Sequence, residues 1–313
     1  MADLWRIAFM GTPQIAASTL EKLIEGPDPV VGVVTQPDRP AGRGRKPSGS
    51  PVRELANNRG LPVVTPEKIR TAEFFDTLKA WQPDVIAVVA YGRILPAAVL
   101  DLPPHGCINV HYSLLPKYRG AAPAAWTIIN GEPEGGVTTM RLSEEMDAGP
   151  IYLQRAIILE ESETAESLQK KLTPMGADLL LETLRRLKDG SLASREQDAS
   201  LASKAPMLKK EDGRIDWSQS AVEIERRVRG LYPWPATYTY INGKLLKIHR
   251  AKPIAVAPAG IPGTVLRSSD AGFWVATGDG ALALEEVQLE NKNRLSGVAF
   301  TRGARVKSGD RLQ

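Results

Sequence analysis

Asn109 and His111 lie at the end of an apolar stretch that starts at residue 105, and a Ser-Leu-Leu-Pro turn follows them. An imidazole exchanges protons near neutral pH, and an Asn amide is a donor suited to a developing oxyanion. No serine or cysteine nucleophile is obvious beside the pair. The pair therefore favours direct transfer of an acyl-type group to an amine over a covalent acyl-enzyme. The alternative is that both residues are polar groups that cap a turn.

A carboxylate close to His111 would fix the tautomer of its ring and favour the imidazolium. Asp147 is a candidate for this carboxylate, in the segment at residues 143–150. The same segment contains Glu144 and Glu145. Spacing in the sequence does not distinguish between the three.

A second candidate site is the stretch QPDRPAGRGRK at residues 36–46. It is rich in Pro and Gly and has no apolar anchor, which predicts an exposed, mobile loop. Mobile basic loops beside a crevice suit phosphate backbones. An ordinary surface loop is the alternative interpretation. The basic residues of this stretch are Arg39, Arg43, Arg45 and Lys46.

The composition is that of an ordinary soluble protein, with 42% hydrophobic and 24% charged residues. A chain of 313 residues is long for one domain, so two are expected. It shows no signal peptide and no apolar run near the roughly 20 residues of a membrane helix. The single cysteine, Cys107, suits a reducing compartment, and His105 and His249 lie outside metal-ligand spacing. We expect a cytoplasmic monomer with no metal and no membrane contact.

Charge is distributed unevenly along the chain, although the formal net charge is only +4. Residues 1–200 hold 22 Lys and Arg against 25 Asp and Glu, a balance of −3. Residues 201–313 hold 18 against 11, a balance of +7. The basic C-terminal third predicts an anionic partner, with nucleic acid the leading candidate, whereas a solvated basic surface is the simpler interpretation.

Alternating strand and helix patterns over residues 1–190 predict an open parallel α/β sheet with right-handed crossovers. Ligands of such sheets bind at the carboxyl ends of the strands. Tyr91, Gly92, His111 and the loop around Asp147 all follow strands, so we expect them to converge there. The strand patterns are at residues 5–10, 30–35, 84–90, 105–110 and 136–142, and the helix patterns at 14–25, 52–58, 72–81 and 122–129.

The pattern changes in the last third of the chain. A long helix is predicted at residues 164–189, with a kink or break at Pro174. Residues 191–206 are polar without periodicity and are interpreted as a linker. A short helix and five short strands then predict a small β-barrel, of the oligonucleotide-binding type. These elements are expected at residues 220–229, 236–241, 245–251, 263–266, 273–276 and 281–287.

The common ligand signatures of an α/β sheet are missing. Gly11-Thr12-Pro13 stands where a dinucleotide fold places G-x-G-x-x-G, and there is no P-loop. Nicotinamide and flavin dinucleotides are therefore disfavoured.

Short motifs such as FMGTP (9–13), GCINVH (106–111) and MDAG (146–149) occur over nearly the whole chain, and together they resemble those of the methionyl-tRNA formyltransferase family. Their order and spacing together are highly specific, although no single motif is long. The motifs are FMGTP (9–13), TQPDRPAGRGR (35–45), VAYGRILP (89–96), GCINVH (106–111), SLLPKYRGAAP (113–123), MDAG (146–149), RIDWS (214–218), PWP (233–235) and SGDRL (308–312).

The resemblance implies a Rossmann-like formyltransferase domain at residues 1–190, a linker at 191–206 and a tRNA-binding β-barrel at 207–313. It implies transfer of a formyl group from 10-formyltetrahydrofolate to the α-amine of methionine on initiator tRNA, for translation initiation.

The resemblance also implies roles for single residues. Asn109, His111 and Asp147 would be the catalytic set. The expected folate contacts are Ser113, Leu114, Leu115, Pro116, Tyr91, Gly92 and Leu95. The loop at 36–46 would enter the tRNA acceptor stem, with Arg43 the leading contact beside Arg39, Arg45 and Lys46. The barrel would hold the acceptor arm, with Lys209 and Lys210 on phosphates.

One residue departs from the family pattern. Tyr112 stands where the family usually has Gly or Ala, and a bulky side chain there could narrow the pocket. In a strand it would point opposite to His111 and Ser113, so we expect it to be tolerated.

Two other functions compete with this one. Formyltransferases that act on glycinamide ribonucleotide or on amino sugars share the catalytic elements. The former would end near the first domain, and the basic loop and barrel favour tRNA over a sugar. A non-catalytic tRNA-binding module is the second alternative, but Asn109, His111 and Asp147 are all present.

Overall fold

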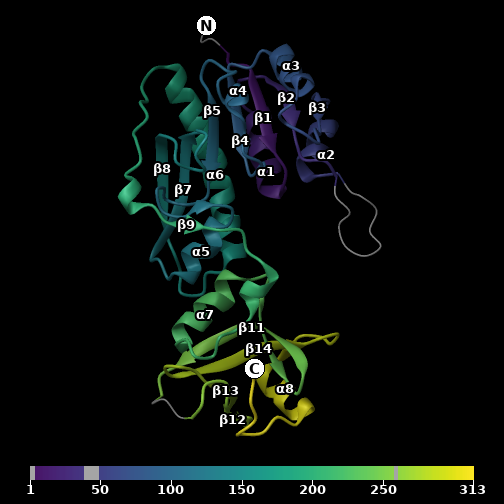
Figure 1. Ribbon diagram of the computed structural model, residues 1–313, viewed down its shortest axis with the longest axis vertical. Coiled ribbons are helices and arrows are strands. Elements are labelled where there is room, and N and C mark those ends of the chain that lie inside the picture. Colours follow the sequence, from purple (N-terminus) through teal and green to yellow (C-terminus); the bar gives the residue numbers. More distant parts are fainter. Residues whose placement is uncertain (1–3, 39–48, 257–259) are drawn as a thin grey trace. The chain divides into compact units, whose positions relative to one another are not determined.

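The computed structural model describes residues 4–38, 49–256 and 260–313 (Figure 1). The chain forms two compact units. Unit 1 comprises residues 1–123, 135–157 and 169–206, and unit 2 comprises residues 124–134, 158–168 and 207–313. The sequence predicts a domain at residues 1–190 and a linker at 191–206, whereas segments 124–134 and 158–168 lie in unit 2 and residues 191–206 lie in unit 1.

Unit 1 is built on a mostly parallel, seven-stranded sheet. Strands β1 to β5 pair in parallel, and apolar runs in the sequence predicted all of these strands except the two-residue β3. Strand β7 pairs antiparallel to β5, and β8 forms the edge. The order across the sheet is β3 (Val63–Val64), β2 (Val30–Val34), β1 (Ile7–Gly11), β4 (Val85–Val89), β5 (Cys107–His111), β7 (Glu134–Arg141) and β8 (Ile151–Ile158).

The antiparallel edge and strand β8 differ from the sequence prediction. Only Ile151 of β8 is fully buried, and three of its residues face solvent, so β8 lacks the buried run that reveals an inner strand. A short loop joins β7 to β8, which suits neighbouring antiparallel strands and would not allow a parallel crossover.

Helices pack on this sheet, and the periodic sequence patterns located all of them closely except the short α4, which was not predicted. They are α1 (Gln14–Ile24), α2 (Pro51–Asn58), α3 (Ala72–Trp81), the short α4 (Ala97–Leu100) and the long α6 (Ala165–Lys188). The expected break at Pro174 does not occur, since α6 is one continuous helix. The Thr173 hydroxyl donates to the Gln169 carbonyl at 2.7 Å, which supports the backbone beside the proline.

Unit 2 is an antiparallel sheet that its last residues close into a small barrel. The backbones of Tyr240 and Gln313 exchange two hydrogen bonds of 2.9 Å, and Val265 N–H donates to Asp310 at 2.8 Å. The segment at 309–313 thus joins both edges of the sheet. Its elements are α7 (Ala221–Gly230), β10 (Thr237–Ile241), β11 (Lys244–Ile254), β12 (Val265–Ser269), β13 (Gly272–Ala276), β14 (Ala281–Leu289), the short β15 (Leu295–Ser296) and α8 (Gly297–Ala304).

Two segments from earlier in the chain complete unit 2. The Arg229 guanidinium of α7 donates to the Glu163 carbonyl at 2.8 Å. A methyl group added at Gly230 would lie 2.5 Å from Ile129 in α5 (Pro123–Ile129), so α7 and α5 pack closely. Residues 124–134 and 158–168 are therefore part of the packing around α7.

Candidate active site

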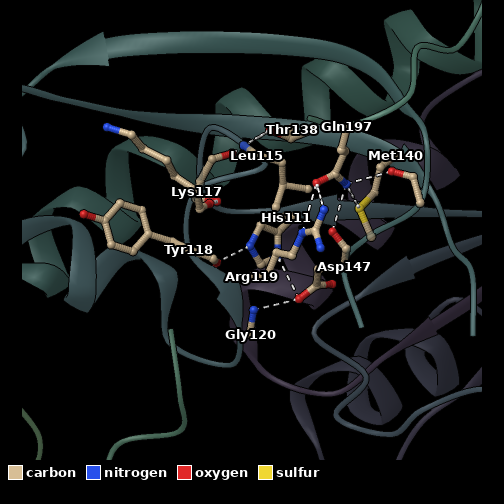
Figure 2. A network of polar contacts seen from close by, with 12 residues as sticks. His111, Leu115, Lys117, Tyr118, Arg119, Gly120, Thr138, Met140, Asp147 and Gln197 are labelled. Atoms are coloured by element: carbon tan, nitrogen blue, oxygen red, sulfur yellow. Dashed lines mark hydrogen bonds and ion pairs between the residues drawn. The ribbon is translucent and has the colours of Figure 1, made fainter. Parts of the chain in front are cut away.

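His111 is the last residue of β5, and its ring is almost completely buried at 5% exposure. Its Nε2 lies 2.8 Å from the carbonyl oxygen of Tyr118 (Figure 2). A carbonyl oxygen only accepts hydrogen bonds, so Nε2 carries a hydrogen and donates it. The other nitrogen, Nδ1, faces Asp147 Oδ2 at 3.7 Å, which is longer than a hydrogen bond. Nδ1 is therefore the nitrogen through which this ring can exchange a proton.

Asp147 is the carboxylate that the fold brings beside His111. Its Oδ2 accepts a 2.8 Å hydrogen bond from the Gly120 backbone N–H, and its side chain is 13% exposed. Glu145 lies at the surface with a 78% exposed side chain, 3.5 Å from Arg119 Nη1, and Glu144 is exposed. The structure thus shows which of the three carboxylates lies beside His111, which the spacing in the sequence could not do.

Asn109 lies two residues before His111 on β5, so strand alternation places both side chains on the same face of the sheet. Asn109 is 8% exposed, and no described residue is recorded in a hydrogen bond with its side chain. Its amide can therefore donate to a ligand.

Tyr112 points to the helix layer behind the sheet. A methyl group added at Gly176 of α6 would lie 3.2 Å from the Tyr112 ring, so the glycine makes room for it. The Tyr112 hydroxyl is buried without a well-formed hydrogen bond. Burial raises the pKa of Tyr112 to about 12, and a contact with the Thr19 hydroxyl of α1 opposes part of that shift. The bulky residue is thus accommodated on the side opposite to His111, as strand alternation predicted.

The turn after β5 is supported from the antiparallel edge of the sheet (Figure 2). The Thr138 hydroxyl of β7 donates to the Ser113 carbonyl at 2.6 Å and accepts from the Leu115 N–H at 3.1 Å. Gln154 of β8 donates to the Leu115 carbonyl at 2.8 Å. The Leu115–Pro116 peptide is cis. Thr138 and Gln154 thus fix the residues that the resemblance assigns to folate binding, and nothing in the sequence distinguished them.

The loop after β4 carries the other three expected folate contacts. Gln36 donates to the Tyr91 carbonyl at 2.7 Å, and Gly92 has a φ of +80° that suits glycine. The side chains of Tyr91 and Leu95 are 1% and 4% exposed and belong to the hydrophobic cluster beneath the loop. Those two side chains therefore hold the loop in place from inside the core.

Residues 195–205, which we call the strap, also belong to the site. Ser203 accepts from the Tyr118 N–H through its hydroxyl at 2.9 Å and from the Arg119 N–H through its carbonyl at 2.8 Å. Beside it, β9 (Lys204–Ala205) pairs in parallel with β6 (Arg119–Gly120). The sequence predicted only a linker here, because contacts made by the backbone and by single side chains leave no periodic pattern.

The predicted tRNA contacts lie away from these loops in the sequence. Lys209 and Lys210 are exposed near the start of the 207–313 segment of unit 2, where a short 3₁₀ turn begins. Arg39, Arg43, Arg45 and Lys46 lie outside the described residues.

The other side chains that could react, those of Cys107, His105 and His249, are engaged in packing or in hydrogen bonds. Burial raises the pKa of the Cys107 thiol to about 12, so it is protonated and inert. His105 stacks on Trp5 with ring centroids 3.9 Å apart, and His249 contacts Gln288. No cluster of His, Cys, Asp or Glu in the described ranges could hold a metal ion. None of the helices described is long and apolar enough to cross a membrane.

Comparison with known proteins decides the family. Residues 5–184 match the family described as formyl transferase, and residues 207–305 match the formyl transferase C-terminal domain. A methionyl-tRNA formyltransferase from Desulfotalea psychrophila is 50% identical over 96% of this chain and 93% of its own length. The chain belongs to the methionyl-tRNA formyltransferase family. It is a formyltransferase. The resemblance inferred from the sequence motifs is confirmed.

Solved structures agree on the fold. WlaRD, a sugar 3N-formyl transferase solved in the presence of dTDP and 5-N-formyl-THF, is 18% identical with a TM-score of 0.66 over 93% of this chain and all of its own. HypX from Aquifex aeolicus, in complex with tetrahydrofolic acid, is 21% identical with a TM-score of 0.60 over 96% of this chain. The chain spans about half the length of HypX, 47%. The predicted fold class, a Rossmann-like sheet followed by a small barrel, is confirmed for this methionyl-tRNA formyltransferase family member.

Proposed function

We propose that the protein transfers the formyl group of 10-formyltetrahydrofolate to the α-amine of methionine on initiator methionyl-tRNA. The product, N-formylmethionyl-tRNA, serves translation initiation in the cytoplasm. The observation that carries the proposal is the pairing of His111 Nδ1 with the Asp147 carboxylate, 3.7 Å away, beside the Asn109 amide, which has no hydrogen-bond partner among the described residues. The 50% identical relative, which carries the name of this activity, supports the same substrates.

The site residues fit an attack by the amine on the formyl carbon. As the new C–N bond forms, the Asn109 amide and protonated His111 donate to the oxygen on which negative charge develops. The Asp147 carboxylate holds the imidazolium charge and helps to relay the proton of the attacking amine. That proton ends on the folate nitrogen as its bond to the formyl carbon breaks.

Binding roles complete the proposal. The Ser113–Pro116 turn and the loop of Tyr91, Gly92 and Leu95 contact the folate. Lys209, Lys210 and the basic residues of the loop at 36–46, Arg43 foremost, contact tRNA phosphates. The protein acts as a monomer without a metal.

The deciding experiment mixes the purified protein with 10-formyltetrahydrofolate and charged tRNA. We expect formyl transfer to initiator methionyl-tRNA and much less to elongator methionyl-tRNA, and a rate lower by about 10²–10⁴ in the His111→Ala variant. Glycinamide ribonucleotide and amino-sugar nucleotides serve as competing acceptors. Tight binding of tRNA without formyl transfer would instead identify a non-catalytic binding module.

A further inference from the structure

Gln197 is the residue of the strap that touches the Asp147 loop. Its side-chain Nε2 donates to the carbonyl oxygens of Asp147 at 2.9 Å and Gly149 at 2.7 Å. Its Oε1 accepts from Arg119 Nε at 3.1 Å and Nη2 at 2.9 Å. Figure 2 shows this amide between the two loops.

The orientation of the Gln197 amide is determined by its partners. The two carbonyl oxygens can only accept, and the guanidinium can only donate. Rotating the amide by half a turn would place oxygen against oxygen and N–H against N–H, with the loss of all four hydrogen bonds. Only glutamine, with one donor end and one acceptor end at this length, satisfies both sides.

The backbone that Gln197 holds is in an unusual conformation. Asp147 has a φ of +52°, in the left-handed region that non-glycine residues seldom adopt. Such a conformation persists where the surroundings hold it. The hydrogen bond from Gln197 to the Asp147 carbonyl and that from Gly120 to the carboxylate are the contacts that do so.

Arg119 extends the effect to the histidine side of the site. Arg119 lies between Tyr118, whose carbonyl accepts from His111, and Gly120, whose N–H donates to Asp147. By holding the Arg119 side chain and the Asp147 backbone together, one amide joins the two loops on which the His111–Asp147 pairing depends.

We propose that Gln197 is a positioning residue that sets the Asp147 carboxylate against His111 for formyl transfer. The inference rests on the proposed function for its catalytic consequence. Its structural part, that Gln197 maintains the Asp147–Gly120 hydrogen bond, stands separately and can be tested without any activity.

The informative variant is Gln197→Glu, which keeps the shape and the acceptor for Arg119 but cannot donate to the Asp147 and Gly149 carbonyls. We expect kcat to fall by about 10²-fold, the usual effect of misplacing a reacting group by about 1 Å. KM for tRNA and for folate should change little, because the binding loops keep their other supports. Gln82→Glu is the matched control, since Gln82 is exposed just before the start of β4, at the amino end of the strands, whereas His111 lies at the carboxyl end of β5.

A double-mutant cycle distinguishes positioning from general support. In an Asp147→Asn background, adding Gln197→Glu should lower the residual kcat no further, since Gln197 acts through Asp147. A full additional loss in that background, or a rise in both KM values with kcat unchanged, would overturn the proposal.

Hydrogen exchange of the Gly120 amide gives the readout that needs no substrate. We expect exchange at Gly120 to be at least tenfold faster in Gln197→Glu than in the wild type and in Gln82→Glu. Should Gln197→Glu fail to fold, Gln197→Met supplies an uncharged replacement of similar length. Unchanged exchange at Gly120 overturns the positioning role. If exchange at Gly120 is faster in Gln197→Glu but the wild-type protein transfers no formyl group, the positioning role is retained and the proposed function is rejected.

Discussion

The His111 ring has one nitrogen in a hydrogen bond with the backbone and one that faces the Asp147 carboxylate. Donation from Nε2 to the Tyr118 carbonyl at 2.8 Å fixes the orientation of the ring. The Asp147 carboxylate lies 3.7 Å from Nδ1, which is too far for a hydrogen bond, so the two groups can interact only through charge. The pairing therefore depends on the charge of the Asp147 carboxylate.

Replacing either member of the pair should lower the rate of formyl transfer by about 10²–10⁴, the usual effect of a positioned acid–base group. For Asp147 the useful variant is Asn, which retains an oxygen for the Gly120 N–H but removes the charge. Initial rates for His111→Ala, Asp147→Asn and Asp147→Ala measure this. If Asp147→Asn turned over at the rate of the wild type, the charge would have no role.

Substitutions at Tyr112 should change stability and leave the chemistry intact. Tyr112→Ala leaves a cavity between β5 and α6, which we expect to cost about 3–5 kcal/mol of unfolding free energy. Tyr112→Phe removes a buried hydroxyl without a well-formed hydrogen bond, so stability should stay the same or rise. Urea unfolding and initial rates together provide the check. A large loss of kcat in Tyr112→Phe would place the hydroxyl in the active site.

At the level of elements, α7 begins with a reciprocal capping box between Ser220 and Glu223, and the Glu223 carboxyl is its titratable group. The Glu223 carboxylate accepts from the Ser220 N–H at 2.9 Å and from its hydroxyl at 2.7 Å, and Ser220 Oγ accepts from the Glu223 N–H at 3.2 Å. These hydrogen bonds from Ser220 lower the pKa of Glu223 from its ordinary value of 4.5. The folded state therefore binds fewer protons than the unfolded state between the two pKa values.

This difference predicts a pH-dependent contribution to stability. It is fully present above about pH 4.5 and is lost as pH falls through the lowered folded pKa. Ser220→Ala should cost about 1 kcal/mol at neutral pH, as for other serine N-caps. The difference from the wild type should shrink in acid. Urea unfolding from pH 7 to pH 3 measures it, with Glu223→Gln as the variant that removes the titration. A constant difference across that range would contradict the prediction.

Periodicity in the sequence located the elements that pack by repeating patterns. The inner strands of unit 1 and the helices α1, α2 and α3 all carry such patterns, and their bounds agree within a few residues. The strap and β8 carry none, because Gln197, Ser203 and Gln154 act through single hydrogen bonds. Motifs could place Asn109 and His111 at a strand end, but choosing Asp147 from its neighbours needed the family resemblance or the coordinates.

For the whole molecule, the uneven charge predicts how binding of tRNA responds to salt. Residues 201–313 carry 18 basic and 11 acidic residues, and Lys209 and Lys210 are exposed. If this unit makes 6–10 phosphate contacts, affinity should fall by about 10³–10⁵ between 50 and 200 mM salt. Lys209→Ala and Lys210→Ala should each reduce the slope of log affinity against log salt by about 1. A flat profile would exclude phosphate contacts as the source of affinity.

The packing around α7 also bears on how such enzymes can diversify. Unit 2 takes residues 124–134 and 158–168 from within the first half of the chain. A gene rearrangement that exchanged only the stretch after residue 206 would separate α7 from Ile129 and Glu163, against which it packs. A new C-terminal partner would have to cover α5 or come with compensating changes there. Recombination at the linker therefore carries a structural cost, and inheritance of both parts as one gene avoids it.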